Sequence, residues 1–200
     1  MLLRKFFCGL LLLPALASAH HSQKHDGEGD VRGLRNVTVL IVRHAEKPDD
    51  GSGLTPRGEA RAEAYATYFD PLRLDGETLQ PQRLIATSDS KSSERPRLTL
   101  TPLAARLQLP LEQPFADKQV DKLVESLREQ NQANVLLIAW HHGHINDLIS
   151  AFGGDTNALL GRDKWPGDVY NWLVVLHFDD RGQLIPSSSH LVQEHLLPGY

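Results

Sequence analysis

The chain has 200 residues and a formal net charge of −4, and 40% of its residues are hydrophobic. This length and composition suit one domain with a buried core better than two domains. The acidic balance excludes the broad basic surface that nucleic-acid binding requires. Cys8 is the only cysteine, so the chain cannot form an internal disulfide.

Residues 1–19 have the pattern of a cleavable secretory signal. Two basic residues precede an apolar run that closes on the small residues Ala17 and Ala19. The run is too short for a membrane span, and Cys8 precedes it instead of standing at the cleavage point of a lipoprotein. We therefore expect cleavage after Ala19 and a periplasmic or secreted product without a stable membrane anchor.

Residues 20–35 are polar and lack periodicity, which predicts a flexible tail. Its histidines, His20, His21 and His25, offer ligands for a divalent metal, although a solvated tail is the simpler interpretation. A single domain is expected over residues 36–200.

This domain alternates short β-branched apolar runs with amphipathic stretches, as an α/β protein does. In chain order the predicted elements are a strand over 37–42, a helix over 54–72, a strand over 83–88, helices over 95–107 and 117–130, a strand over 134–140, a helix over 145–152 and a strand over 171–178. Pro102 is expected to kink or split the second helix. The order predicts a three-layer sandwich, with a mainly parallel sheet and helices on both faces.

The carboxyl edge of such a sheet is where functional residues gather. The first predicted strand ends on Arg43 and His44, and the third ends on a run of three histidines that Gly143 interrupts. The other residues expected at this edge are His141, His142 and His144, together with Arg95 and Arg97, which follow the second strand. Imidazoles that converge beside arginines imply an anion between them, most simply a phosphoryl group.

Phosphoryl transfer through an enzyme intermediate needs residues of these types. A neutral imidazole must lie in line with phosphorus, and donors must hold the three equatorial oxygens. A second histidine supplies a further donor, and a carboxylic acid or water protonates the leaving oxygen.

Four stretches resemble motifs of the histidine phosphatase superfamily, whose members have the phosphoglycerate-mutase-like fold. RHA at 43–45 resembles the RHG signature, with Ala45 in the glycine place, and IAWHHGHINDLI at 138–149 resembles the second-histidine motif. The other matching positions are Leu54, Thr55, Gly58 and Ala62 in one helix, with Arg61 where glutamine is common, and Arg95, Thr99, Leu103 and Ala104 in the next. Four motifs in the family's order, over about residues 37–152, make a specific signal.

The resemblance implies that His44 is the phosphorylated nucleophile and that Arg43, Arg95 and His141 complete the phosphate pocket. Arg97 replaces Arg95 if the register moves by two residues, and His142 is a further candidate ligand. The compact chain is similar to the small SixA-like members, which lack the inserted glutamate that donates a proton in larger members. The acid stays unassigned, because a solvated helix face explains the nearby carboxyl groups Asp117, Asp121 and Glu125 equally well.

Several residues near these motifs have simpler interpretations. Glu46 and Lys47 suit a surface ion pair, or Lys47 adds positive potential at the pocket mouth. Arg57 and Arg61 are expected to be solvated helix residues. His142 and His144 are either substrate contacts or ordinary surface histidines, and Trp165 and Trp172 favour core or lid packing.

The sequence thus predicts a metal-independent phosphoric monoester hydrolase that needs no cofactor and acts on a small phosphorylated substrate. Two alternatives remain open. A catalytically inactive module that binds phosphate ligands would have the same pocket. A histidine-rich metal-binding protein would use His141, His142 and His144 with the tail, although the chain lacks the HExxH spacing and the arginines would repel the metal.

Overall fold

The computed structural model describes residues 33–199, so the signal segment and tail residues 20–32 lie outside the described residues. Within residues 33–199 the elements are, in order, β1 (Thr38–Arg43), α1 (Pro56–Tyr68), β2 (Leu72–Leu74), β3 (Glu77–Leu79), β4 (Arg83–Ala86), α2 (Arg95–Leu107), β5 (Leu111–Glu112), α3 (Val120–Gln130), β6 (Val135–Trp140), α4 (His142–Ala151), α5 (Thr156–Leu160), β7 (Trp172–His177), a 3₁₀ turn (Pro186–Ser188) and β8 (His190–Gln193). None of these helices is both long and apolar enough to cross a membrane.

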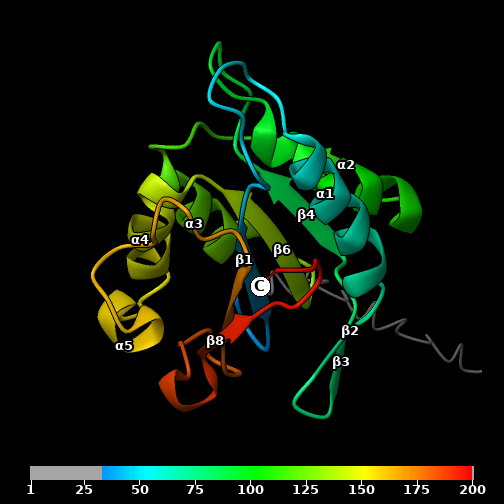
Figure 1. Cartoon of the computed structure of the whole chain (residues 1–200). Helices are drawn as coiled ribbons and strands as arrows, with labels where there is room; N and C mark the ends of the chain where they lie inside the picture. Colours follow the sequence, from blue (N-terminus) through cyan, green and yellow to red (C-terminus); the bar gives the residue numbers. More distant parts are fainter. Residues whose placement is uncertain (1–32, 200) are drawn as a thin grey trace, which may run out of the picture.

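A six-stranded sheet in the order β5-β4-β6-β1-β7-β8 forms the centre of the molecule (Figure 1). The first four of these strands are parallel, whereas β7 runs antiparallel to β1 and to β8. β2 and β3 pair with each other as a separate hairpin. The carboxyl ends of β1, β4 and β6 therefore lie side by side at one edge of the sheet.

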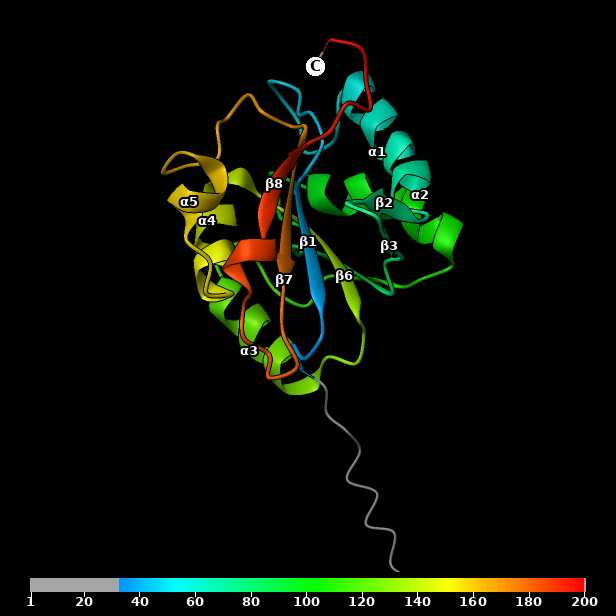
Figure 2. The ribbon, with the colours of Figure 1, turned by 90° about the horizontal axis from the view of Figure 1, so that it is seen from below.

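Helices cover both faces of the sheet, with α1 and α2 on one side and α3, α4 and α5 on the other (Figure 2). Alternate residues of each central strand enter the two cores: Leu40 and Val42 face α1 and α2, whereas Val39 and Ile41 face α3 and α4. Every residue of β1 and β6 is buried, which explains their continuous apolar runs. The predicted three-layer α/β fold is confirmed.

The predicted strands and helices are all present, with boundaries that shift by up to a few residues. Pro102 lies inside α2 and does not split it. Leu34 lies in the segment that the sequence predicts to be a flexible tail, but it is 3% exposed and packs in the core, so the packed domain begins before Asn36. The hairpin β2–β3, the short strand β5, the helix α5 and the edge strand β8 were not predicted, because each is too short to establish a periodicity.

The start of α1 supports the loop that follows β1. Thr55 caps α1 by accepting a hydrogen bond from Gly58 N at 3.0 Å, and Pro56 fills the first helical position, as the sequence predicted. The backbone N–H of Thr55 also donates to the Glu46 carbonyl at 3.0 Å. Gly58 packs so closely on Glu46 that an added Cβ would lie 2.5 Å from the Glu46 carbonyl oxygen.

We predict that Gly58→Ala destabilises the protein by about 1–3 kcal/mol, because the new methyl group would force α1 away from the Glu46 backbone. Gly143→Ala is the matched control, since a Cβ at this helical glycine meets nothing within 4 Å. Chemical denaturation of the two variants and the wild type measures the difference. Equal stability of Gly58→Ala and the wild type would contradict the close contact.

Candidate active site

His44 lies at the carboxyl end of β1 and is only 2% exposed. Its Nδ1 lies 2.7 Å from the Ala45 carbonyl oxygen, and because a carbonyl only accepts, Nδ1 carries the proton. Nε2 is then left with its lone pair. Burial lowers the pKa of His44 to about 2, with further lowering by Arg43, His141 and Arg95, although the hydrogen bond to Ala45 opposes this shift. His44 is therefore a neutral imidazole, as a nucleophile must be.

His141 lies beside His44, with ring centroids 5.1 Å apart in an edge-to-face arrangement. β6 and β1 are neighbours in the sheet, so their carboxyl ends bring the two histidines together. Burial lowers the pKa of His141 to about 4, partly offset by Asp117. His141 is also the N-cap residue of α4, and its carbonyl accepts a hydrogen bond from His144 N at 2.9 Å, whereas the N–H groups of His142 and Gly143 begin the helix, where no acceptor lies within it. An anion between the histidines would face these N–H groups.

A cavity of about 340 Å³ opens in front of these two histidines. Its lining comes from the loops after β1, β4, β5 and β6: His44, Lys47, Ser88, Asp89, Ser90, Ser92, Ser93, Arg95, Ala116, Asp117, His141, His142, Gly143 and His144. The serine-rich segment 88–93 was not singled out in the sequence, although its position directly after a buried strand was a usable signal.

The structure distinguishes the two candidate arginines of α2. Arg95 lines the cavity, donates from Nη1 to the Gly51 carbonyl at 3.0 Å, and has a buried Nε without an acceptor among the described residues. Arg97 instead forms ion pairs of 2.7 Å with Asp89 and Glu94 and does not line the cavity. Burial lowers the pKa of Arg95, whereas hydrogen bonding to Asp89 raises that of Arg97.

Thr99 explains why Arg95, and not Arg97, lies at the cavity. Its hydroxyl accepts a hydrogen bond from Ala45 N at 2.8 Å and donates one to the Arg95 carbonyl at 2.8 Å. Thr99 therefore docks the first turn of α2 against the loop that carries His44. This contact places Arg95, the first residue of α2, at the cavity.

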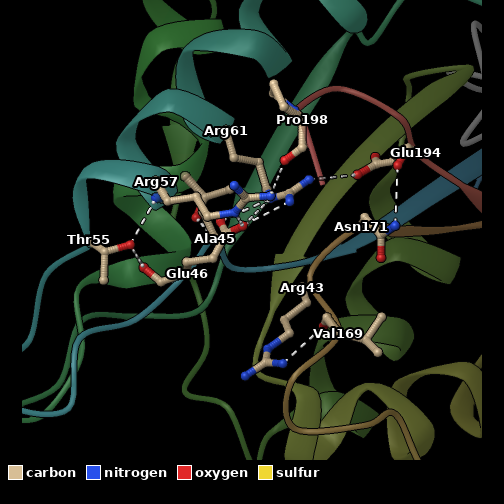
Figure 3. Close-up of polar contacts among 12 residues, drawn as sticks. Arg43, Ala45, Glu46, Thr55, Arg57, Arg61, Val169, Asn171, Glu194 and Pro198 are labelled. Carbon is tan, nitrogen blue, oxygen red and sulfur yellow. Dashed lines mark hydrogen bonds and ion pairs between the residues drawn. The ribbon is translucent and has the colours of Figure 1, made fainter. Parts of the chain in front are cut away.

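Arg43 is fully buried behind His44, and the cavity lining does not include it. Its Nη1 donates to the Gly167 carbonyl at 2.8 Å and to the Val169 carbonyl at 2.9 Å, and Figure 3 shows the contact with Val169. Its guanidinium carbon lies 3.8 Å from the centre of the Tyr170 ring, a cation–π contact. Nε and Nη2 have no hydrogen-bond partner among the described residues. Arg43 thus fixes the segment before β7 and keeps two donor groups uncommitted.

Sequence reasoning missed Tyr170, whose ring centre lies 6.2 Å from that of His44. β7 is antiparallel to β1, so the segment preceding β7 reaches the carboxyl end of β1. No local sequence pattern predicts this contact. Trp165 and Trp172 pack against each other in the core near this segment, with ring centroids 5.4 Å apart, which agrees with core packing.

His142 and His144 both line the cavity but differ in their partners. His142 has a buried Nδ1 without an acceptor among the described residues, and burial, Arg43 and Lys47 lower its pKa. His144 Nδ1 lies 2.9 Å from Asp147, and its Nε2 lies 3.8 Å from Asp117.

Asp117 is the one of the three candidate acids that lines this cavity, whereas Asp121 and Glu125 line a separate hollow beside α3. The Asp117 backbone is held by the Trp140 indole, which donates to its carbonyl at 3.0 Å. Over residues 33–199 no group of three His, Cys, Asp or Glu side chains is arranged to hold a metal ion. The tail histidines lie outside the described residues.

The prediction for Arg61 was wrong, and of the two alternatives for Glu46 and Lys47 the structure agrees with the second, in which Lys47 lies at the pocket. Arg61 was expected to be solvated, but it is fully buried and forms a two-point ion pair with Glu46. Glu46 is 7% exposed, so it belongs to this buried pair and not to a surface pair with Lys47. Lys47 lines the cavity, where it adds positive charge.

No protein-family model matches this sequence, and no curated protein matches it significantly. Solved structures do match. One assigned to an alpha-ribazole-5′-P phosphatase of Escherichia coli has a TM-score of 0.55 at 15% identity, covering 82% of this chain and 100% of that one. The protein histidine phosphatase SixA, complexed with tungstate, has a TM-score of 0.52 at 17% identity, covering 78% and 97%.

A phosphoglycerate mutase from Plasmodium falciparum matches with a TM-score of 0.51 at 17% identity, covering 82% of this chain and 94% of the mutase. These matches extend over most of the described domain and include its mixed, mainly parallel sheet. The chain therefore has the phosphoglycerate-mutase-like fold that SixA also has.

Proposed function

We propose that this protein is a phosphatase of the histidine phosphatase type, which hydrolyses a small phosphomonoester through a phosphohistidine on His44. One observation carries the proposal: Nδ1 of His44 is committed to the Ala45 carbonyl, so the buried neutral ring has its lone pair on Nε2. The tungstate complex of SixA supports it, because tungstate is a tetrahedral oxyanion like phosphate.

In the first step, the Nε2 lone pair of His44 attacks phosphorus, and the bond from phosphorus to the leaving oxygen breaks. Arg95, His141 and the first N–H groups of α4 would hold the equatorial oxygens. In the second step, water attacks the phosphohistidine, the N–P bond breaks, and its electron pair returns to Nε2. Inorganic phosphate then leaves.

Asp117 is the proposed proton donor. It would protonate the leaving oxygen in the first step and accept a proton from the attacking water in the second, which restores its starting state. The proposal rests on the position of Asp117, which lines the same cavity as His44 and lies on the loop after β5.

We also propose that the protein acts in the periplasm or after secretion. The support is the signal-like composition of residues 1–19, with small residues at the expected cleavage point. No metal or cofactor enters the proposed steps.

We predict that His44→Ala abolishes turnover of phosphomonoesters and that the wild type, quenched during turnover, carries an acid-labile phosphate on His44. The reason is that the substitution removes the Nε2 lone pair that attacks phosphorus. Mass spectrometry at neutral pH locates the phosphate. Tight phosphate binding without any turnover by the wild type would favour the inactive binding module instead.

Arg95→Ala should lower kcat/KM by about 100-fold or more, because a charge-assisted donor to the developing anion is lost. Arg97→Ala is the matched control, and its loss should stay below about fivefold, since the Arg97 side chain does not line the cavity. Both are measured on one substrate, with folding checked by circular dichroism. The reverse ranking would show that the motif register is wrong.

Asp117→Asn should slow the hydrolysis of alkyl phosphates by about 100-fold or more but affect p-nitrophenyl phosphate much less, because a weakly basic leaving group needs no proton. Asp121→Asn is the control, since Asp121 lies outside the cavity. The ratio of kcat/KM for the two substrates is compared in each variant. An unchanged ratio in Asp117→Asn would exclude Asp117 as the donor.

A further inference from the structure

Three side chains on one face of α1 hold segments that are distant in sequence. Arg57, Arg61 and Tyr65 are spaced by four residues, so they point in one direction from the helix. Arg57 donates to the Pro198 carbonyl at 2.9 Å (Figure 3). Tyr65 donates to the Glu194 carboxylate at 2.8 Å. Arg61 lies between them and contacts two carboxylates.

The first carboxylate is Glu46, two residues after His44. Arg61 Nε lies 3.0 and 3.2 Å from the two Glu46 oxygens, and Nη2 lies 2.8 Å from one of them. Arg61 is fully buried and Glu46 nearly so. A buried ion pair adds little stability relative to apolar residues of similar volume, so stability alone does not explain this one. Its two-point geometry does fix the position of Glu46.

The second carboxylate is Glu194, which follows β8. Arg61 Nη1 lies 3.8 Å from it, and its side chain is fully buried. The Glu194 backbone N–H donates to the Asn171 carbonyl at 2.7 Å, and the Asn171 side chain donates to the Glu194 carbonyl at 3.3 Å. Asn171 adjoins Tyr170, which packs on Arg43. Arg61 thus contacts the loop of His44 through Glu46, and it contacts the segment that carries Tyr170 through Glu194.

The loop of His44 is held by a different element at each residue. His44 N donates to the Trp140 carbonyl in β6 at 3.0 Å, and Ala45 N donates to Thr99 in α2. Glu46 is held by α1, at its carbonyl by Thr55 and at its side chain by the two-point pair with Arg61, beside a longer 3.4 Å contact from Arg57 Nε. The peptide unit between Ala45 and Glu46 carries the carbonyl that accepts the His44 proton, so its orientation depends on both flanking anchors.

We propose that Arg61 is a positioning residue for His44: its ion pair with Glu46 orients the Ala45 carbonyl that keeps the ring proton on Nδ1, and its contact with Glu194 ties this loop to the segment before β7. The proposal rests on the proposed role of His44 and deepens it. A ring that loses this acceptor can carry its proton on Nε2, where the lone pair is then lost to attack.

The expected signature is a loss in kcat with little change in KM, because Arg95 and His141 still hold the phosphoryl oxygens. Arg61→Gln and Glu46→Gln should each lower kcat by about 10- to 100-fold, as a misoriented catalytic group does. Arg61→Lys keeps the charge but not the two-point geometry, so it should recover part of this loss.

The matched control is Glu112→Gln. Glu112 forms a two-point pair with Arg83, at 2.7 Å for both contacts, between β5 and β4 and away from the cavity. This variant breaks the same kind of pair, so kcat should stay within about twofold of the wild type. If Arg61→Gln does not fold, Glu46→Gln and Glu194→Gln, which preserve side-chain shape, carry the test.

Nitrogen-15 NMR of the histidine rings, recorded without substrate and assigned with His44→Ala, measures the tautomer directly. The wild type and Glu112→Gln should show the proton of His44 on Nδ1, and Glu46→Gln should show a shift of population toward Nε2. Folded Arg61 and Glu46 variants with unchanged kcat and an unchanged tautomer would overturn the proposal. A wild type without phosphatase activity would instead contradict the proposed function, and the NMR comparison would still decide the role of Arg61.

Discussion

The hydrogen bond from His44 Nδ1 to the Ala45 carbonyl decides what the site can do. An imidazole has one proton and two nitrogens, so committing Nδ1 to a carbonyl leaves Nε2 as a base. Burial then keeps the ring neutral, because a charged imidazole would lose its hydration and lie beside the arginines Arg43 and Arg95. The rest of the loop architecture can be understood as support for this one bond.

The cavity holds two basic side chains, Lys47 and Arg95, together with two acidic ones, Asp89 and Asp117, so its cationic groups are local and not part of a basic surface. Arg95 and Lys47 face the cavity, whereas Arg61 and Arg97 are paired with carboxylates and Arg43 is directed to backbone carbonyls. These arginines therefore have different roles, because the fold places each one beside different partners. An anionic ligand would meet donors that are already fixed in place, which is the condition for strong electrostatic stabilisation.

The sequence predicted the sheet, its main helices and the meeting of His44, Arg95 and His141, because buried parallel strands have continuous apolar runs and place their ends together. It did not predict the burial of Arg61. A single arginine among alanines on an amphipathic helix has the pattern of a solvated residue, and its second partner, Glu194, lies more than a hundred residues away. It also missed Tyr170, because the antiparallel orientation of β7, which brings that segment to the site, leaves no trace in local periodicity.

There is a physical reason why a charged pair, Arg61 and Glu46, supports the loop of His44 in place of apolar residues. Apolar residues of the same volume would fill the space between α1 and the loop, but apolar contacts are not directional and permit small rotations of the peptide unit. A guanidinium fork on a carboxylate fixes both distance and plane. Such a pair adds little stability, because the cost of desolvation offsets the attraction between the charges. It does make the orientation of the Ala45 carbonyl depend on the position of α1. The helix α1 therefore acts on the nucleophile without touching it, through Glu46 on the loop of His44 and through Glu194 on the segment before β7.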